Sequence, residues 1–282
     1  MIAYLGTGLL GSGFVRKLLE RGETVRVWNR TPEKALALAG EGAVVCATAA
    51  EAVRGADQIH LTLADDASVD AVLEPLAGAI GGATLILDHT TTAPTPTGER
   101  VARWKQRGVT FVHTPVFMGP AAARNAQGFM LLSGAPDVRA TVTPLIAPMT
   151  GKVIDLGDDP TRASAFKLFG NMMLVFIVSG LADGYRFAES LGIPATQAQR
   201  LFDDFKPGVS IDVRGKAMAR GDFTPQWELA MARKDIRLML EEAQRHGVSL
   251  AVLPAIAGFF DTYVQAGLGG EDVGVVARRD LA

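Results

Sequence analysis

Three features that define other classes of protein are missing from this sequence. Its 282 residues include one cysteine, Cys46, so no disulfide can form within the chain. No His or Cys cluster surrounds Cys46, so no metal site is predicted, and a reducing, cytoplasmic location is expected. The 28 Lys and Arg residues nearly balance the 30 Asp and Glu residues. This balance argues against binding to nucleic acid or to an anionic membrane surface.

No segment is predicted to cross a membrane or to act as a secretory leader. The residues after Met1 run directly into a glycine turn, without a basic leader and a long apolar stretch. The most hydrophobic stretch, residues 172–182, is shorter than the roughly 20 apolar residues that a bilayer requires. We therefore interpret it as a buried helix of a soluble protein.

The first 160 residues alternate short apolar runs with helical segments, which is typical of a parallel sheet wound with helices. Between the first strands, residues 14–21 and 32–40 are predicted to be helices, the second with Thr31 as N-cap and Pro32 as its first residue. The predicted strands are residues 2–5, 24–28, 43–46, 58–63, 84–88, 110–114, 129–133 and 152–156. This pattern predicts an α/β fold with a doubly wound Rossmann sheet.

Beyond residue 160 the strand signals stop. A long central helix is predicted at 162–191, ended by Gly192 and Pro194. Further helices are predicted at 196–205, 226–246 and 252–266. The chain is thus expected to contain a Rossmann domain at residues 1–160 and a helical domain at residues 161–282.

A G-x-G-x-x-G motif directly follows the first predicted strand and opens a predicted helix. Gly6 permits the tight turn, Gly8 lets the backbone approach a pyrophosphate, and Gly11 allows close packing of helix on strand. The motif consists of Gly6, Thr7, Gly8, Leu9, Leu10 and Gly11. In this context it predicts a dinucleotide-binding loop, with the phosphates at the helix N-terminus.

The second strand ends in Asn29-Arg30-Thr31 rather than in an acidic residue. A carboxylate at this position accepts a hydrogen bond from a free ribose 2′-hydroxyl, whereas the guanidinium of Arg30 suits a 2′-phosphate. We therefore expect NADP rather than NAD. The alternative is that Arg30 is a solvated loop residue.

Lys167 and Asn171 are four residues apart on the predicted central helix, so they share one face. The neighbours of Lys167 in the sequence are apolar, and burial of its ammonium group lowers its pKa toward a value useful in proton transfer. Lys167 is thus a candidate general acid for carbonyl reduction. The alternative is a lysine that extends past apolar neighbours to water.

These motifs, in this order, resemble those of the β-hydroxyacid dehydrogenases, the relatives of 3-hydroxyisobutyrate dehydrogenase and of glyoxylate/succinic semialdehyde reductase. The resemblance extends over the whole chain. It depends on the glycine motif, on residues 29–31, on Asp88-His89-Thr90-Thr91-Thr92-Ala93-Pro94, on Lys167 with Asn171, and on Lys234-Asp235.

The resemblance implies a role for each matching residue. Lys167 is implied as the catalytic acid or base and Asn171 as the residue that orients substrate, with help from the hydroxyls of Thr90 and Thr92. Further roles are implied for Thr91 beside the nicotinamide, for Lys234 at the cofactor, for Trp227 and Asp235 in closing the site, and for Leu63, Ala64 and Asp65 along the adenosine and ribose. Family members commonly dimerise through the central helix, which would make residues 172–182 part of an interface; a purely internal core fits the sequence equally well.

The chain departs from the family at one place. Where the family has a Ser-Gly-Gly turn that binds a substrate carboxylate, this chain has Phe117, Met118 and Gly119. Phe117 has no side-chain donor, and Met118 cannot approach as closely as glycine. One interpretation is that backbone N–H groups still bind the carboxylate; the other is a more apolar substrate.

The sequence therefore predicts an NADPH-dependent oxidoreductase that transfers hydride to a small aldehyde or ketone, with Lys167 as general acid or base. One alternative is reduction of C=N bonds by an imine reductase-like enzyme. Another is a module that binds NADP without catalysis. His89 and His113, which end predicted strands, are interpreted as structural residues.

Overall fold

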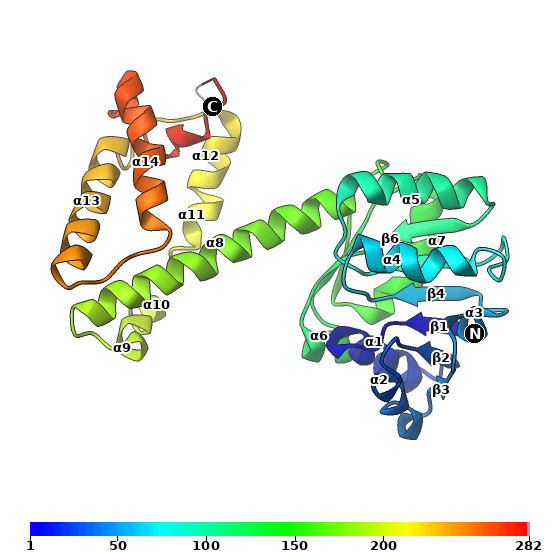
Figure 1. Ribbon diagram of the computed structural model, residues 1–282. Coiled ribbons are helices and arrows are strands. Elements are labelled where there is room, and N and C mark those ends of the chain that lie inside the picture. The colour runs from blue at the N-terminus through cyan, green and yellow to red at the C-terminus, as the bar shows by residue number, and fades with distance from the viewer. Residues whose placement is uncertain (281–282) are drawn as a thin grey trace. The chain divides into compact units, whose positions relative to one another are not determined.

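The structure, a computed structural model, describes residues 1–280 (Figure 1). The chain divides into two compact units, residues 1–172 and the residues from Met173 onward. Helix α8 (Arg162–Ser190) begins in the first unit and continues into the second. The first unit extends past the predicted boundary at residue 160 because the start of α8 packs with it, and Ala163 and Ser164 are fully buried there.

The first unit is built on a six-stranded sheet in the order β3-β2-β1-β4-β5-β6, and all of its strand pairs are parallel. Every one of these strands was predicted, and no end differs from the prediction by more than two residues. The strands are β1 (Ile2–Leu5), β2 (Val25–Trp28), β3 (Val44–Val45), β4 (Gln58–Leu61), β5 (Leu85–Asp88) and β6 (Thr110–His113).

Helices cover both faces of this sheet. Because side chains alternate along a strand, Ile2 and Tyr4 of β1 pack in one core cluster with Phe14 of α1, whereas Ala3 and Leu5 pack in another. Figure 1 shows α4 and α5 on the side of the sheet opposite α1. The helical segments are α1 (Leu9–Glu20), α2 (Pro32–Leu36), η1 (Ala39–Glu41), α3 (Ala49–Val53), α4 (Asp66–Leu73), η2 (Glu74–Leu76), α5 (Pro94–Gln106), α6 (Pro120–Arg124), α7 (Pro136–Ile146) and η3 (Ala147–Met149). The predicted doubly wound Rossmann fold is confirmed.

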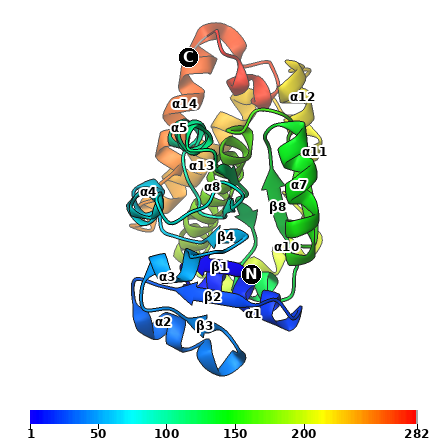
Figure 2. The same ribbon diagram turned by 90° about the vertical axis from the view of Figure 1, so that its right-hand side faces the viewer.

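The last two predicted strands do not extend this sheet. β8 (Phe129–Leu132) and β9 (Lys152–Asp155) form a second sheet with β7 (Val116–Phe117), in the order β7-β8-β9. Figure 2 shows α7 beside β8. β7 was not predicted, because a strand of two residues has no detectable alternation, and its antiparallel pairing with β8 places Phe117 opposite Phe129.

The second unit contains helices and no strand among its described residues, as predicted. Its core is formed by α13 (Leu229–Arg245), α14 (Leu253–Tyr263) and the segment that follows them, with Leu229, Tyr263 and Val275 buried. The predicted helix at 196–205 is two short helices. The other helical segments are α9 (Ala195–Gln199), α10 (Leu201–Asp204), α11 (Val209–Asp212), α12 (Arg214–Arg220), η4 (Val264–Leu268) and η5 (Val273–Ala277).

The prediction that residues 172–182 form an internal core is wrong for the single chain. Val175, Phe176 and Val178 are 61%, 58% and 66% exposed. Within residues 1–280, α8 is also the one helix that is long and apolar enough to cross a membrane by length and composition. An exposed apolar surface of this kind is typical of a contact site.

Candidate active site

The glycine motif forms the turn between β1 and α1, and two of its glycines are required by close backbone contacts. Gly6 has φ +97°, and a Cβ there would lie 2.2 Å from the carbonyl oxygen of Thr62. A Cβ on Gly11 would lie 2.0 Å from the carbonyl oxygen of Gly6. These contacts allow α1 to start directly against the ends of β1 and β4.

Gly8 differs from the other two glycines because it borders open space. Apart from its chain neighbours, no described residue has an atom within 4 Å of the position that its Cβ would take. Gly8 is also the N-cap of α1, and no side chain caps the helix, so the first N–H groups are available to a ligand. An anion such as a pyrophosphate fits this position, since the helix N-terminus carries a partial positive charge. Leu9, which follows, is 82% exposed, and Leu10 packs partly on the core.

Asn29 supports the glycine loop from within the protein. Its Oδ1 accepts a hydrogen bond from the Thr7 backbone N at 2.9 Å, and its Nδ2 donates to the Thr31 carbonyl oxygen at 2.9 Å. Thr31 occupies the N-cap position of α2 as predicted, but its hydroxyl caps no N–H group. Asn29 thus holds the loop, and Arg30 is exposed beside it.

One cation near this loop was missed by the sequence analysis. Lys34 of α2 lines a cavity of about 250 Å³ together with Thr7 and Gly8 of the glycine loop. The signal in the sequence was the position of Lys34 in the first turn of the helix that begins after Thr31, close to the glycine loop. Arg16 lines the same cavity but is paired with Glu41 at 2.8 Å, so Lys34 is the cation better able to reach an added phosphate.

The loop after β4 is held by its own hydrogen bonds. The Asp65 carboxylate accepts from the Ser68 backbone N at 2.8 Å and caps α4. The Leu63 backbone N donates to Thr90 Oγ1 at 3.0 Å. Leu63 is half-buried, and Ala64 and Asp65 are exposed. Their predicted place along the adenosine stays a prediction.

Two of the three threonines after β5 do not fit the role predicted for them. Thr90 and Thr92 are 1% and 2% exposed. The Thr90 hydroxyl accepts from Leu63, and that of Thr92 lies 2.9 Å from Thr97 Oγ1 and 3.0 Å from His113 Nε2. Their hydroxyls therefore brace the loops rather than contact substrate. Thr91, between them, is exposed.

Lys167 and Asn171 are paired on α8. Lys167 Nζ donates to Asn171 Oδ1 at 2.9 Å, which confirms that the two side chains share a face. Lys167 is 8% exposed, and burial lowers its pKa. The apolar neighbours in its sequence are not the cause, since Phe166 and Phe169 are 49% and 61% exposed. Asn171 Nδ2 makes no hydrogen bond within residues 1–280, so its donors remain available.

Phe117 supplies much of the cover over Lys167. Its ring centroid lies 4.2 Å from Lys167 Nζ. The ring also packs against α8, where a Cβ on Gly170 would lie 2.3 Å from Phe117 Cζ. Met118 packs against the core of the first unit, and Gly119 is the exposed N-cap of α6. Of the three residues in the altered turn, Phe117 is thus the one in contact with the Lys167 ammonium group.

The remaining predicted site residues belong to the second unit. Trp227 is 44% exposed, and Lys234 Nζ lies 2.5 Å from Asp235 Oδ1. Their predicted contacts with cofactor and substrate stay predictions.

The buried histidines of the first unit form internal hydrogen bonds, as interpreted. His60 Nδ1 lies 3.0 Å from His89 Nε2, and His89 Nδ1 lies 3.0 Å from the Thr114 carbonyl oxygen. No group of His, Cys, Asp and Glu among residues 1–280 is arranged to hold a metal ion.

Comparison with known proteins defines the class. The protein-family model of the NAD binding domain of 6-phosphogluconate dehydrogenase matches residues 1–157. The model for the NAD-binding region of NADP-dependent 3-hydroxyisobutyrate dehydrogenase matches residues 162–279. These matches and the site describe an NAD(P)-dependent oxidoreductase. The chain belongs to the β-hydroxyacid dehydrogenase family, which confirms the resemblance seen in the sequence.

Individual relatives match over nearly the whole chain. An uncharacterised oxidoreductase of Bacillus subtilis is 26% identical over 96% of this chain and 96% of its own length. A probable 3-hydroxyisobutyrate dehydrogenase of Mycobacterium tuberculosis is 28% identical over 88% of this chain and 87% of its own. Among solved structures, an imine reductase from Myxococcus stipitatus in complex with NADP+ has a TM-score of 0.92 at 20% identity, covering 99% of both chains.

Proposed function

We propose that this protein is an NADPH-dependent reductase of small aldehydes or ketones with an apolar body, and that Lys167 is its general acid. The observation that carries the proposal is the hydrogen bond on α8 between Asn171 and the buried Lys167, whose ammonium group lies beneath the ring of Phe117. Bound NADPH would supply hydride to the carbonyl carbon. In the reverse reaction Lys167 would act as the base.

The residues around Lys167 support this role in two ways. Asn171 Oδ1 holds the ammonium group and leaves the amide Nδ2 free to donate to the carbonyl oxygen. As negative charge develops on that oxygen, Lys167 Nζ gives it a proton, and an amine with a lowered pKa gives up its proton more readily. Phe117 excludes water from the ammonium group and offers no donor to a carboxylate, which favours an apolar substrate.

NADPH is proposed over NADH because two cations flank the expected position of the adenosine. Arg30 is exposed after β2, and Lys34 lines the cavity at the glycine loop. Both can pair with a 2′-phosphate, and no acidic residue ends β2. Arg30→Ala and Lys34→Ala should each weaken NADPH binding about tenfold and leave NADH binding nearly unchanged, measured by quenching of protein fluorescence.

The test of catalysis compares Lys167→Ala with Lys152→Ala, a lysine exposed on β9. Purified protein is incubated with NADPH and panels of carbonyl acids, simple aldehydes and cyclic imines. Loss of Lys167 should reduce turnover about 10²- to 10⁴-fold without weakening NADPH binding. Unchanged turnover in Lys167→Ala would contradict the mechanism.

Imine reduction is the second candidate, and the apolar cover by Phe117 favours it over reduction of an acid. The solved imine reductase has the same fold at 20% identity, which bears on architecture alone. Turnover of cyclic imines with no turnover of carbonyl compounds would select this candidate.

We further propose a cytoplasmic homodimer in which a second copy covers α8. The exposed apolar residues of α8 would be buried by such a contact, at about 1.5–3 kcal/mol for each large side chain. Val175→Glu should convert the dimer to a monomer in light scattering, whereas Arg186→Glu on the same helix should not. Binding of the wild-type protein to phosphatidylcholine vesicles would instead favour a membrane contact.

A further inference from the structure

Two buried serines hold the start of α8, and one of them lies on the same helix face as Lys167. Ser164 is fully buried, and its Oγ donates a hydrogen bond to the carbonyl oxygen of Thr92 at 2.5 Å. Ser133 is 2% exposed, and its Oγ accepts a hydrogen bond from the Ala163 backbone N at 2.9 Å. Since Thr92 follows β5 and Ser133 follows β8, these two bonds tie α8 to both sheets of the first unit.

The hydrogen bond of Ser164 is unusual for a serine inside a helix. Such a serine often donates to a carbonyl oxygen of its own helix, one turn back. Ser164 instead donates to a residue 72 positions away in the chain. The Thr92 carbonyl oxygen accepts no other hydrogen bond within residues 1–280, and Thr92 is 2% exposed. The bond therefore provides the partner that this buried carbonyl group requires.

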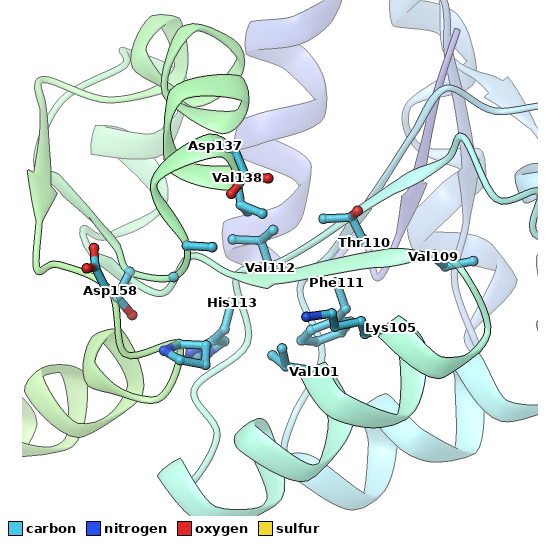
Figure 3. A pocket seen from close by; sticks show the side chains of 14 residues that line it. Val101, Lys105, Val109, Thr110, Phe111, Val112, His113, Asp137, Val138 and Asp158 are labelled. Carbon is cyan, nitrogen blue, oxygen red and sulfur yellow. The ribbon is translucent and has the colours of Figure 1, made fainter.

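Close packing fixes the start of α8 on the side of α5, but a cavity borders it as well. A Cβ on Gly98 of α5 would lie 2.9 Å from Thr161 Cγ2, just before α8. Ser133, Asp158 and Pro160 line a cavity of about 410 Å³, together with residues of β6 (Figure 3). Protein interiors are normally close-packed, so this cavity leaves the segment that leads into α8 without a packed neighbour there. The hydrogen bonds of the two serines restrain the helix start on that side.

Ser164 lies one turn before Lys167. Ser164, Lys167 and Asn171 are spaced by three and by four residues, so they share one face of α8. A rise of 1.5 Å per residue separates Ser164 from Lys167 by about 4.5 Å along the helix axis. The acceptor Thr92 directly follows the exposed Thr91 in the loop after β5. A shift of α8 against this loop would therefore move Lys167 relative to Thr91.

From these contacts we propose that Ser164 is a positioning residue for Lys167. Its hydrogen bond to Thr92 fixes the first turns of α8 against the loop after β5, and Lys167 takes its position from them. The inference rests on the proposed function of Lys167 as the general acid.

The first test is a double-mutant cycle of Ser164→Ala with Lys167→Ala, measured as single-turnover oxidation of bound NADPH by the best substrate of the panel. Ser164→Ala should lower the rate about tenfold in the wild-type background, since a displacement of about 1 Å can cost up to about 10²-fold. In the Lys167→Ala background the same change should lower the rate by less than about twofold. Binding of NADPH should stay unchanged. An equal factor in the two backgrounds would overturn the positioning role.

The second test needs neither substrate nor cofactor. Reductive methylation labels Lys167 with ¹³C methyl groups, which the ring of Phe117, 4.2 Å from Nζ, shields. In Ser164→Ala the methyl signal of Lys167 should move toward that of exposed lysines, because the first turns of α8 are no longer fixed. Lys167→Arg assigns the signal. An unmoved signal would overturn the role of Ser164, whereas unchanged turnover in Lys167→Ala would contradict the proposed acid.

Two further variants complete the design. Ser179→Ala is the matched control, since Ser179 lies on the same helix and its hydroxyl makes no hydrogen bond within residues 1–280. It should change neither the rate nor the Lys167 signal. Ser164→Cys has nearly the size of the native side chain and a weaker donor, so it replaces Ser164→Ala in both tests if that variant does not fold. It should act in the same direction.

Discussion

Replacing Phe117 with alanine should move the titration of Lys167 to higher pH. Burial lowers the pKa of Lys167, and the ring of Phe117, 4.2 Å from Nζ, is part of that burial. Two effects of removing the ring oppose one another. Loss of the cation–π contact destabilises the ammonium group by about 0.5–2 kcal/mol, whereas entry of water stabilises it.

Hydration of the ammonium group should exceed the loss of the cation–π contact. Lys167 has no ionic partner within residues 1–280, and hydration is the larger source of stabilisation for an ammonium ion. We expect the pKa of Lys167 to rise toward its ordinary value in Phe117→Ala. In the direction of reduction Lys167 must be protonated, so activity falls as pH rises through its pKa. The falling limb of kcat/KM against pH should therefore move to higher pH in Phe117→Ala.

The measurement is a pH profile of NADPH oxidation with the best substrate of the panel. Phe129→Ala is the matched control, since Phe129 pairs with Phe117 across the β7–β8 ladder and its ring forms no cation–π contact with Lys167 within residues 1–280. ¹³C NMR of the reductively methylated protein gives the same pKa without substrate, with Lys167→Arg to assign the signal. A limb that stays in place or moves to lower pH refutes the argument that Phe117 acts by desolvating Lys167.

Three further predictions concern binding and stability. Gly11→Ala should lower the melting temperature and abolish NADPH binding, because its Cβ would lie 2.0 Å from the Gly6 carbonyl oxygen. Gly8→Ala should weaken NADPH binding without lowering the melting temperature, because its Cβ would enter open space. Equal losses of melting temperature in the two variants would contradict this prediction. Asp272→Asn should lower the free energy of unfolding in urea at pH 7 by about 2 kcal/mol. Burial raises the pKa of Asp272, but Arg214 and three backbone N–H groups lower it to about 2. A loss below about 0.5 kcal/mol would count against these contacts. The free energy of unfolding should fall by roughly 1.4–2.7 kcal/mol per pH unit as the pH is lowered from 6 to 4. Burial lowers the pKa of His89 and His113 to about 4 and that of His60 well below its usual value, so unfolding takes up protons at these rings. Burial raises the pKa of Asp88 to about 6, so this carboxyl group releases a proton on unfolding and compensates in part, and a flat profile would refute the sign.

The parts of the site that depend on local spacing could be predicted from the sequence. The turn from β1 into α1 follows from three glycines whose roles are set within one loop. Lys167 and Asn171 lie four residues apart on one helix, so their contact follows from helical geometry alone. Both were predicted, and both are found.

What could not be predicted depends on contacts between distant segments. The hydroxyls of Thr90 and Thr92 look available in the sequence, but Leu63 and His113 occupy them. The apolar run of α8 reads as a core helix, because hydrophobicity does not tell an internal surface from one that another molecule covers. The buried Nδ1 of His113 has no hydrogen-bond partner within the described chain, which depends on the packing around the ring and has no signal in the sequence.

Phe117 and Gly170 show how two separate features of the sequence become one feature of the structure. Phe117 alone indicates a lost carboxylate-binding turn, and Gly170 alone is a residue that weakens a helix. In the structure the ring of Phe117 lies where a Cβ on residue 170 would be, 2.3 Å from Cζ, so a side chain at that position would push the ring off α8. The ring can therefore reach Lys167 only because residue 170 is glycine. The environment of the proposed acid is set by a contact between β7 and α8, across more than fifty residues of chain. A substitution of Phe117 or of Gly170 should therefore change the pKa of Lys167 while Lys167 itself stays in place.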